Sequence, residues 1–154
     1  VTRQVAKALP NARIFAGAGV AQSTYVDPIE GGVPLAVDSR LLITSPALGM
    51  AAYPRAARSF LAAYQRLYGP PEPDAILGYE SMRLMLSAIR RATDDGRKPA
   101  SRSAVRRAIL HTRDRHSVLG TYSIDPDGNT SLNAYGVWRA VGGSLRFWKA
   151  LQGS

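Results

Sequence analysis

The segment from Phe60 to Ser81 constrains the fold of this chain more than any other, because it joins two different helices through a rigid break. The first helix is amphipathic, since Phe60, Tyr64, Leu67 and Tyr68 recur at helical spacing and form one apolar stripe. A glycine follows the last of these tyrosines, as is typical of a helix C-terminus, and three of the next four residues are prolines. We therefore expect the chain to leave one packed layer here and to enter another.

The helix after the break, expected over residues 74–92, is apolar on almost every side. Its large apolar residues are Ile76, Leu77, Tyr79, Met82, Leu84, Met85, Leu86 and Ile89. A helix with so little polar face is usually buried among other elements. The sequence therefore predicts that this helix is largely covered.

The remaining pattern interleaves helices with strands and closes on strands alone. We expect a helix over 1–9, strands over 12–16 and 40–45, a short helix over 22–29, a helix over 101–111 capped by Ser101, and strands over 121–124, 133–140 and 144–149. Helices and strands that alternate along a chain indicate an α/β fold. The sequence therefore predicts an α/β class with a β-rich C-terminal tail.

Composition indicates an ordinary folded domain. The chain has 154 residues, 45% of them apolar, and no apolar run approaches the ~18 residues of a membrane-spanning helix. Cysteine is absent, which excludes thiol catalysis and cysteine-ligated zinc. The first residues already have a helical pattern, with Val1, Val5 and Leu9 on one face and no capping residue before them. We therefore expect a fragment of a longer protein.

The positive charge is concentrated between residues 83 and 115. This segment supplies +7 of the net charge of +9, with ten Arg or Lys against three Asp. One interpretation is a patch that binds nucleic acid or an anionic membrane. The other is the solvated faces of two surface helices, and it is favoured because the segment has no aromatic residue to stack on bases.

Three motifs resemble known phosphate-binding or metal-binding motifs, but their sequence details favour a purely structural role. The run Gly17–Val20 resembles a phosphate-binding glycine turn but lacks its third glycine. The run Asp125–Asn129 would need a glutamate at position 134 to bind calcium, and Ala134 is there. His111 and His116 lack an acidic or thiol group at metal-ligand spacing. We therefore expect neither a catalytic nor a metal site, no cofactor, and no enzyme.

Two residues beside the proline-rich break are candidates for ligand contact. Asp74 can cap the following helix or can read the polar head of a ligand, and the two roles are compatible. Tyr79 lies one turn further along, where a buried hydroxyl needs a partner and so often lines a polar cavity. Plain core packing of the ring is the alternative.

Three motifs follow one another along the chain. The first comprises Phe60, Tyr64, Tyr68 and Gly69, then Ala75, Gly78, Tyr79, Glu80 and Ser81; the second comprises Gly120 to Asp125, Gly128 and Asn129; the third comprises Tyr135, Val137, Gly142, Gly143 and Phe147. Together they resemble the type I periplasmic solute-binding proteins of ABC importers, in the leucine/isoleucine/valine-binding branch. The resemblance covers nearly the whole chain but only the last two-fifths of a typical family member.

The resemblance implies two Rossmann-like lobe portions in a three-layer αβα arrangement. Residues 1–69 would belong to the C-terminal lobe, residues 74–118 to the N-terminal lobe, and residues 120–154 would cross back. The family binds a solute between hinged lobes and performs no chemistry. The positions that would line the cleft here are Gly17, Ala18, Gly19, Val20, Asp74 and Tyr79. The family's acidic residue for a ligand ammonium falls at Ala18, so recognition of an α-amino group in the usual way is not expected.

The resemblance therefore implies an extracytoplasmic solute-binding component that captures a branched-chain amino acid, an amide or a related polar compound. Its partner would be the membrane permease of the importer, and its signal segment would lie outside this chain. Dimerisation of the fragment by exchange of elements is a further expectation. The alternatives are a ligand-sensing module of the same fold in a receptor, and a basic module that binds nucleic acid through residues 83–115.

Overall fold

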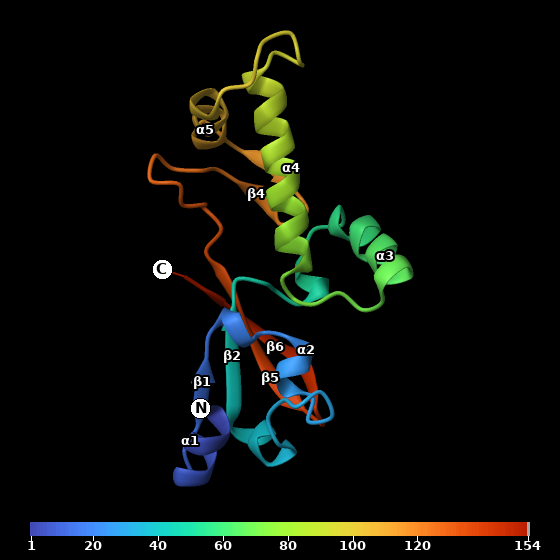
Figure 1. The fold of residues 1–154 in the computed structure, drawn as a ribbon, viewed down its shortest axis with the longest axis vertical. Coiled ribbons are helices and arrows are strands. Elements are labelled where there is room, and N and C mark those ends of the chain that lie inside the picture. Colours follow the sequence, from blue (N-terminus) through green and yellow to red (C-terminus); the bar gives the residue numbers. More distant parts are fainter. Residues whose placement is uncertain (154) are drawn as a thin grey trace. The chain divides into compact units, whose positions relative to one another are not determined.

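A computed structural model describes residues 1–153, which form two compact units (Figure 1). Unit 1 contains Val1–Ala52, Pro70–Asp74 and the residues from Ala134 onward, whereas unit 2 contains Tyr53–Gly69 and Ala75–Asn133. The chain therefore passes between the units at the start of the first long helix, on both sides of the proline-rich break, and before the last hairpin. Among the described residues, no helix has the length and apolar character needed to cross a membrane.

Unit 1 is built on a four-stranded sheet with the order β1-β2-β5-β6. The strands are β1 (Ile14–Ala16), β2 (Leu41–Ser45), β5 (Ala134–Val141) and β6 (Ser144–Gln152), accompanied by the short helices α1 (Thr2–Ala8), η1 (Ala18–Val20), α2 (Ser23–Val26), η2 (Leu35–Arg40) and η3 (Met50–Ala52). The pair β1–β2 is parallel and the other two pairs are antiparallel. The parallel pair brings the carboxyl ends of β1 and β2 to one edge of the sheet.

The core of unit 1 includes one face of β2. Leu41, Ile43 and Ser45 alternate with more exposed residues along β2 and are buried, as the period of two in a strand requires. Trp138 on β5 donates a hydrogen bond from its ring nitrogen to the carbonyl oxygen of Ala47, at 3.1 Å. That bond satisfies the one polar atom of a buried side chain.

Unit 2 is mostly helical. It contains α3 (Ala57–Tyr68), α4 (Ala75–Ala92), α5 (Arg102–Leu110) and the two-stranded sheet of β3 (Arg115–Ser117) and β4 (Gly120–Tyr122). Its core cluster is centred on Ala57, Ile76 and Val118, against which Phe60 and Tyr79 pack. Ser101 caps α5 by accepting a hydrogen bond from the backbone nitrogen of Ala104, which confirms the predicted cap.

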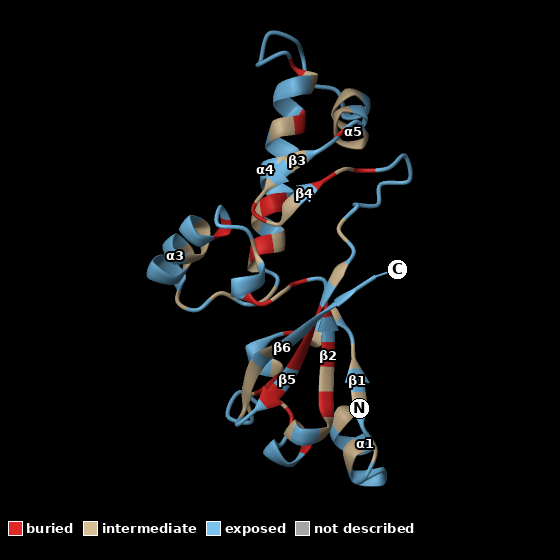
Figure 2. Cartoon of the chain, turned by 180° about the vertical axis from the view of Figure 1, so that it is seen from behind, coloured by how far each residue is buried: buried red, intermediate tan, exposed pale blue. Residues whose placement is uncertain are grey.

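The prediction that the second helix is largely covered is wrong. Of the residues in α4, only Ile76, Glu80 and Ala88 are buried. Met82 keeps 59% of its surface exposed and Leu86 keeps 54%. Figure 2 shows α4 with exposed and intermediate stretches between its few buried ones. The helix has two apolar faces, and the described part of unit 2 covers one of them.

The mixed α/β class and the β-rich tail are confirmed, because β5 and β6 lie where the tail strands are expected. The boundaries of the units differ from those expected for the lobes. Helix α3 groups with unit 2 although residues 1–69 were expected in one lobe, and the chain returns to unit 1 at Ala134, after the expected crossing at residue 120. The assignment of residues to an N-terminal and a C-terminal lobe stays a prediction.

Candidate functional site

The loop after β1 presents exposed backbone. Gly17 is extended and precedes the short helix η1, which contains the other three predicted positions, Ala18, Gly19 and Val20. Gly17 and Gly19 are exposed, and a Cβ atom placed on either would contact nothing within 4 Å. The side chains of Ala18 and Val20 are half-buried. A solute can therefore approach the main chain of this loop closely.

Asp74 is fixed at the same sheet edge by a buried serine. The Ser45 hydroxyl, at the end of β2, donates to Asp74 Oδ1 at 3.1 Å and accepts a hydrogen bond from the backbone nitrogen of Ala47 at 3.0 Å. Ser45 is 1% exposed, whereas Asp74 is an exposed residue. Because a carboxylate can accept several hydrogen bonds, Asp74 retains capacity for a donor from a solute.

A second carboxylate connects the proline-rich break to α2 within unit 1. Glu72 accepts hydrogen bonds from the backbone nitrogen of Ser23, at 3.0 Å, and from the Ser23 hydroxyl. Ser23 is the first residue of α2. Sequence reasoning missed both Glu72 and Ser45. The position of Ser45 at a strand end before a proline was the available signal for the latter.

Tyr79 packs and bonds within unit 2. Its ring stacks on Phe60 with centroids 4.1 Å apart and an interplanar angle of 23°. Its hydroxyl oxygen accepts a hydrogen bond from the Arg83 guanidinium at 3.0 Å, and this bond raises the pKa of Arg83 above its usual value. The ring of Tyr79 is therefore packed and its hydroxyl has a partner, whereas its role in ligand contact stays a prediction.

The candidate residues divide between the units. Gly17, Ala18, Gly19 and Val20 share unit 1 with Asp74, and Tyr79 belongs to unit 2. Within unit 1 the parallel pairing of β1 with β2 brings the glycine loop and Ser45 to the same sheet edge. Asp74, hydrogen-bonded to Ser45, thereby belongs to that edge too.

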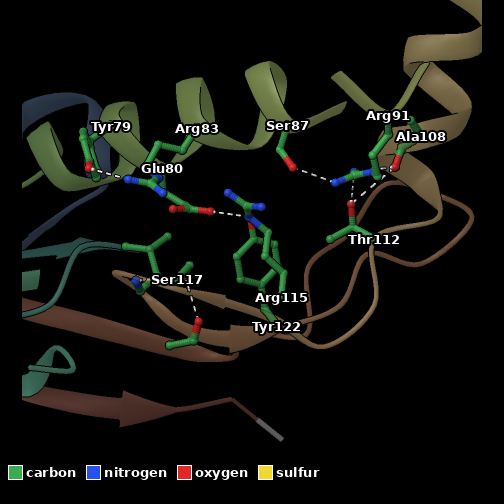
Figure 3. A network of polar contacts seen from close by, with 12 residues as sticks. Tyr79, Glu80, Arg83, Ser87, Arg91, Ala108, Thr112, Arg115, Ser117 and Tyr122 are labelled. Atoms are coloured by element: carbon green, nitrogen blue, oxygen red, sulfur yellow. Dashed lines mark hydrogen bonds and ion pairs between the residues drawn. The ribbon is translucent and has the colours of Figure 1, made fainter. Parts of the chain in front are cut away.

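Glu80 is a buried acid whose role sequence reasoning missed. It is 2% exposed, and its Oε1 accepts a hydrogen bond from Arg115 Nε at 2.6 Å and another from the Tyr122 hydroxyl at 3.0 Å (Figure 3). Burial, together with the neighbouring Glu80 charge, raises the pKa of Tyr122 to about 12. These contacts connect α4 to both strands of the small sheet, which makes Glu80 a structural residue.

The other motifs have the structural roles expected of them. Asp125 accepts hydrogen bonds from the backbone and the side-chain nitrogen of Asn129, and the backbone bond is the largest cause that lowers the pKa of Asp125. His111 contacts the carbonyl of Arg107, and His116 contacts the hydroxyl of Thr121. Residues 1–153 contain no cluster of three acidic or histidine side chains that could bind a metal ion.

Comparison with known proteins gives matches among solved structures alone, since no family model and no curated protein matches. The leucine-binding protein LivK of Thermotoga maritima is 27% identical, with a TM-score of 0.77 over 98% of this chain and 40% of that one. LivJ of Streptococcus pneumoniae, solved with isoleucine, is 20% identical with a TM-score of 0.68 over 97% of this chain and 40% of its own. A benzoate-bound solute-binding protein of R. palustris is 15% identical with a TM-score of 0.69, covering 98% and 39%.

The fold is therefore that of the type I periplasmic binding proteins. Within that class, the chain is similar to the substrate-binding proteins of branched-chain amino acid ABC transporters, which confirms the resemblance carried by the three sequence motifs. The chain spans about 40% of the length of these structures.

Proposed function

We propose that this chain is part of an extracytoplasmic solute-binding protein of an ABC importer. The observation that carries the proposal is the superposition of 98% of the chain on a leucine-binding protein with a TM-score of 0.77. The role is capture of a small polar solute between two hinged lobes and presentation to a membrane permease. Capture of this kind needs binding groups and a hinge, and no catalytic residue.

The proposed contacts with the solute begin at the sheet edge of unit 1. The exposed main chain at Gly17 and Gly19 offers hydrogen-bonding groups to a solute that approaches closely. The Asp74 carboxylate, oriented by Ser45, accepts from a donor on the solute. Tyr79, whose hydroxyl accepts a hydrogen bond from Arg83, is a further contact proposed from the resemblance alone.

The proposed solute is not a simple α-amino acid bound in the family's usual way. Ala18 stands where the resemblance places the acid that pairs with a ligand ammonium, and a methyl group cannot form that pair. The related proteins include one solved with benzoate and one described as a fatty acid transporter protein, so the fold accommodates solutes without an amino group. A solute that carries a hydrogen-bond donor but no ammonium group, such as an amide, fits the proposed site better.

Calorimetry of the complete protein that contains this chain tests the proposal against amino acids, amides and aromatic acids. We expect an amide to bind and Asp74→Ala to weaken that binding by about tenfold, which corresponds to about 1.4 kcal/mol. The matched control is Glu30→Ala, an exposed carboxylate elsewhere in unit 1. Tight binding of every amino acid contradicts the inference from Ala18, and an equal effect of the two substitutions removes Asp74 from the site.

A further inference from the structure

A cavity of about 470 Å³ lies within unit 1, at the end of the four-stranded sheet away from the proposed solute contacts. Arg13 and Arg40, which line it, come just before β1 and β2, whereas the glycine loop and Ser45 are at the opposite ends of the same strands. Because β1 and β2 run parallel, the two groups lie at opposite ends of the sheet, and Figure 1 shows α1 at the end where both strands begin. The cavity is therefore separate from the candidate solute site.

Three arginines that line the cavity share one face of the sheet. The strand register pairs Leu42 of β2 with Arg139 of β5, so these two side chains are neighbours on one face. It also pairs Leu42 with Phe15 of β1. Arg40 comes two residues before Leu42, and Arg13 comes two residues before Phe15. Because side chains two residues apart point to the same side of a strand, the pattern brings the three arginines together.

One of these arginines is committed to the fold and two are not. The Arg40 guanidinium donates hydrogen bonds to the carbonyl oxygens of Leu9, at 2.9 Å, and Ala12, at 3.1 Å, at the end of α1. The side chains of Arg13 and Arg139 have neither an ion-pair partner nor a hydrogen-bond partner among residues 1–153. Both are exposed, so they can bind an anion that enters the cavity.

Arg139 is held in place by an aromatic ring. Its guanidinium carbon Cζ is 3.4 Å from the centre of the Trp148 ring, and the Lys149 ammonium is 4.6 Å from that centre. A guanidinium stacked on an aromatic face keeps the donors in its own plane available for a carboxylate or a phosphate. Because the stacked group is already oriented, it loses little freedom when it binds such an anion.

Asp38 is the one carboxylate among the lining residues that the structure describes. Its Oδ2 accepts a hydrogen bond from the backbone nitrogen of Gly143 at 3.2 Å, and its Oδ1 is buried without a partner among the described residues. It forms no ion pair with a lining arginine in that part of the chain. Three arginines against one carboxylate leave the cavity with an excess of two positive charges.

We propose that this cavity is a second binding site of the protein and takes a small organic dianion, either a phosphate monoester or a dicarboxylate. Arg139 binds the anion through its planar fork, and Arg13 supplies the second positive charge. Leu42 contacts the carbon skeleton of the ligand. The volume is in the range of small-molecule sites. The proposal concerns the far end of the sheet, so it does not depend on solute capture.

Calorimetry of the complete protein that contains this chain tests the proposal. The protein is titrated at low ionic strength with glycerol phosphate, succinate and acetate. We expect one dianion to bind with one-to-one stoichiometry, and acetate, which has a single charge, to bind at least about tenfold more weakly because it can pair with only one of the two arginines. Tighter binding of glycerol phosphate identifies the ligand as a phosphate monoester, and tighter binding of succinate identifies it as a dicarboxylate.

Matched variants separate the cavity from the general positive charge. Arg139→Gln and Arg13→Gln should each weaken binding of the dianion by about tenfold, because each removes a hydrogen bond between charged groups. Arg58→Gln in α3 of unit 2 makes the same change of charge outside the cavity and should leave binding unchanged. All three side chains are exposed, so circular dichroism should show the fold retained.

Four results would overturn the proposal. The first is that neither dianion binds, and the second is that acetate binds as tightly as they do. The third is an equal loss for Arg58→Gln and Arg139→Gln, since the attraction would then be general. The fourth is loss of dianion binding in Asp74→Ala, because the dianion would then occupy the solute site. Dianion binding that persists while no amide binds would contradict the proposed solute and leave this second site intact.

Discussion

Asp74 and Glu80 are carboxylates close together in sequence, and the structure places them in opposite situations. Asp74 is exposed, accepts a hydrogen bond from a buried serine and belongs to unit 1. Glu80 is 2% exposed, pairs with Arg115 and Tyr122, and belongs to unit 2. A buried charge with fixed partners is committed to the fold, whereas an exposed carboxylate held by one bond keeps capacity for a ligand.

Removal of the Glu80 carboxylate should cause the largest loss of folding stability. Glu80→Ala leaves the Arg115 side chain, which is 16% exposed, without its ion-pair partner and leaves the Tyr122 hydroxyl without an acceptor. Loss of one member of a buried pair costs about 3–5 kcal/mol, a large share of a typical domain's stability. Urea denaturation followed by circular dichroism measures it. A loss below about 1 kcal/mol would mean that the pair contributes as little as a surface ion pair.

The Tyr122 phenol gives a pH test of the same contacts. Its pKa is raised to about 12 in the folded protein, from a reference of 10.0, so the folded state holds this proton more tightly than the unfolded state. The stability that this proton contributes is therefore complete below pH 10 and is lost as pH rises through 12. Absorbance of the phenolate during alkaline titration should show one tyrosine that ionises late, and Tyr122→Phe should remove that tyrosine. An unchanged titration curve in the variant would contradict the assignment.

Asp74→Ala should have a smaller effect on stability. The substitution removes one hydrogen bond from Ser45, whose oxygen keeps its bond from the Ala47 nitrogen, so we expect a loss of about 1 kcal/mol. Thermal unfolding compared with Glu80→Ala gives the contrast directly. Equal losses for the two substitutions would show that exposure does not distinguish their roles.

The smallest effect is expected for the basic segment, residues 83–115, when binding of DNA is measured. Ten Arg and Lys lie between residues 83 and 115, but Arg90, Arg91 and Arg115 are already bonded to protein groups. Binding of the chain to a random DNA duplex should therefore be weak even at low salt. Anisotropy measured over a salt series decides the matter, because affinity that falls steeply with salt would support the nucleic-acid alternative.

Local signals predicted much of this fold. The stripe from Phe60 to Tyr68 gave α3, and Ser101 gave the start of α5, because each element depends on neighbours in sequence. Strand β3 was not expected, since three residues that pair with β4 have too little pattern of their own. The exposure of α4 was not expected either, because an apolar helix is covered only where other elements supply the cover.

The candidate site was harder to predict than the fold. Asp74 and Tyr79 were singled out from their positions beside the break, but the groups that orient them, Ser45 and Arg83, were not. Ser45 lies 29 residues before Asp74, and no periodicity connects them. Glu80 was identified only as one residue of the first sequence motif. Its burial depends on β3 and β4, which come about 40 residues later.

The path of the chain through the two units has a consequence for synthesis on the ribosome. Strand β5 lies between β2 and β6 in the sheet of unit 1, yet it follows the whole of unit 2 in sequence. The early strands β1 and β2 therefore emerge long before the strand that completes their sheet. Non-local pairing of this kind delays folding until the distant partner is present. In unit 2, the residues from Ala75 to Asn133 are contiguous in sequence. The helices among them can therefore pack together before β5, the strand that pairs with β2, has been translated.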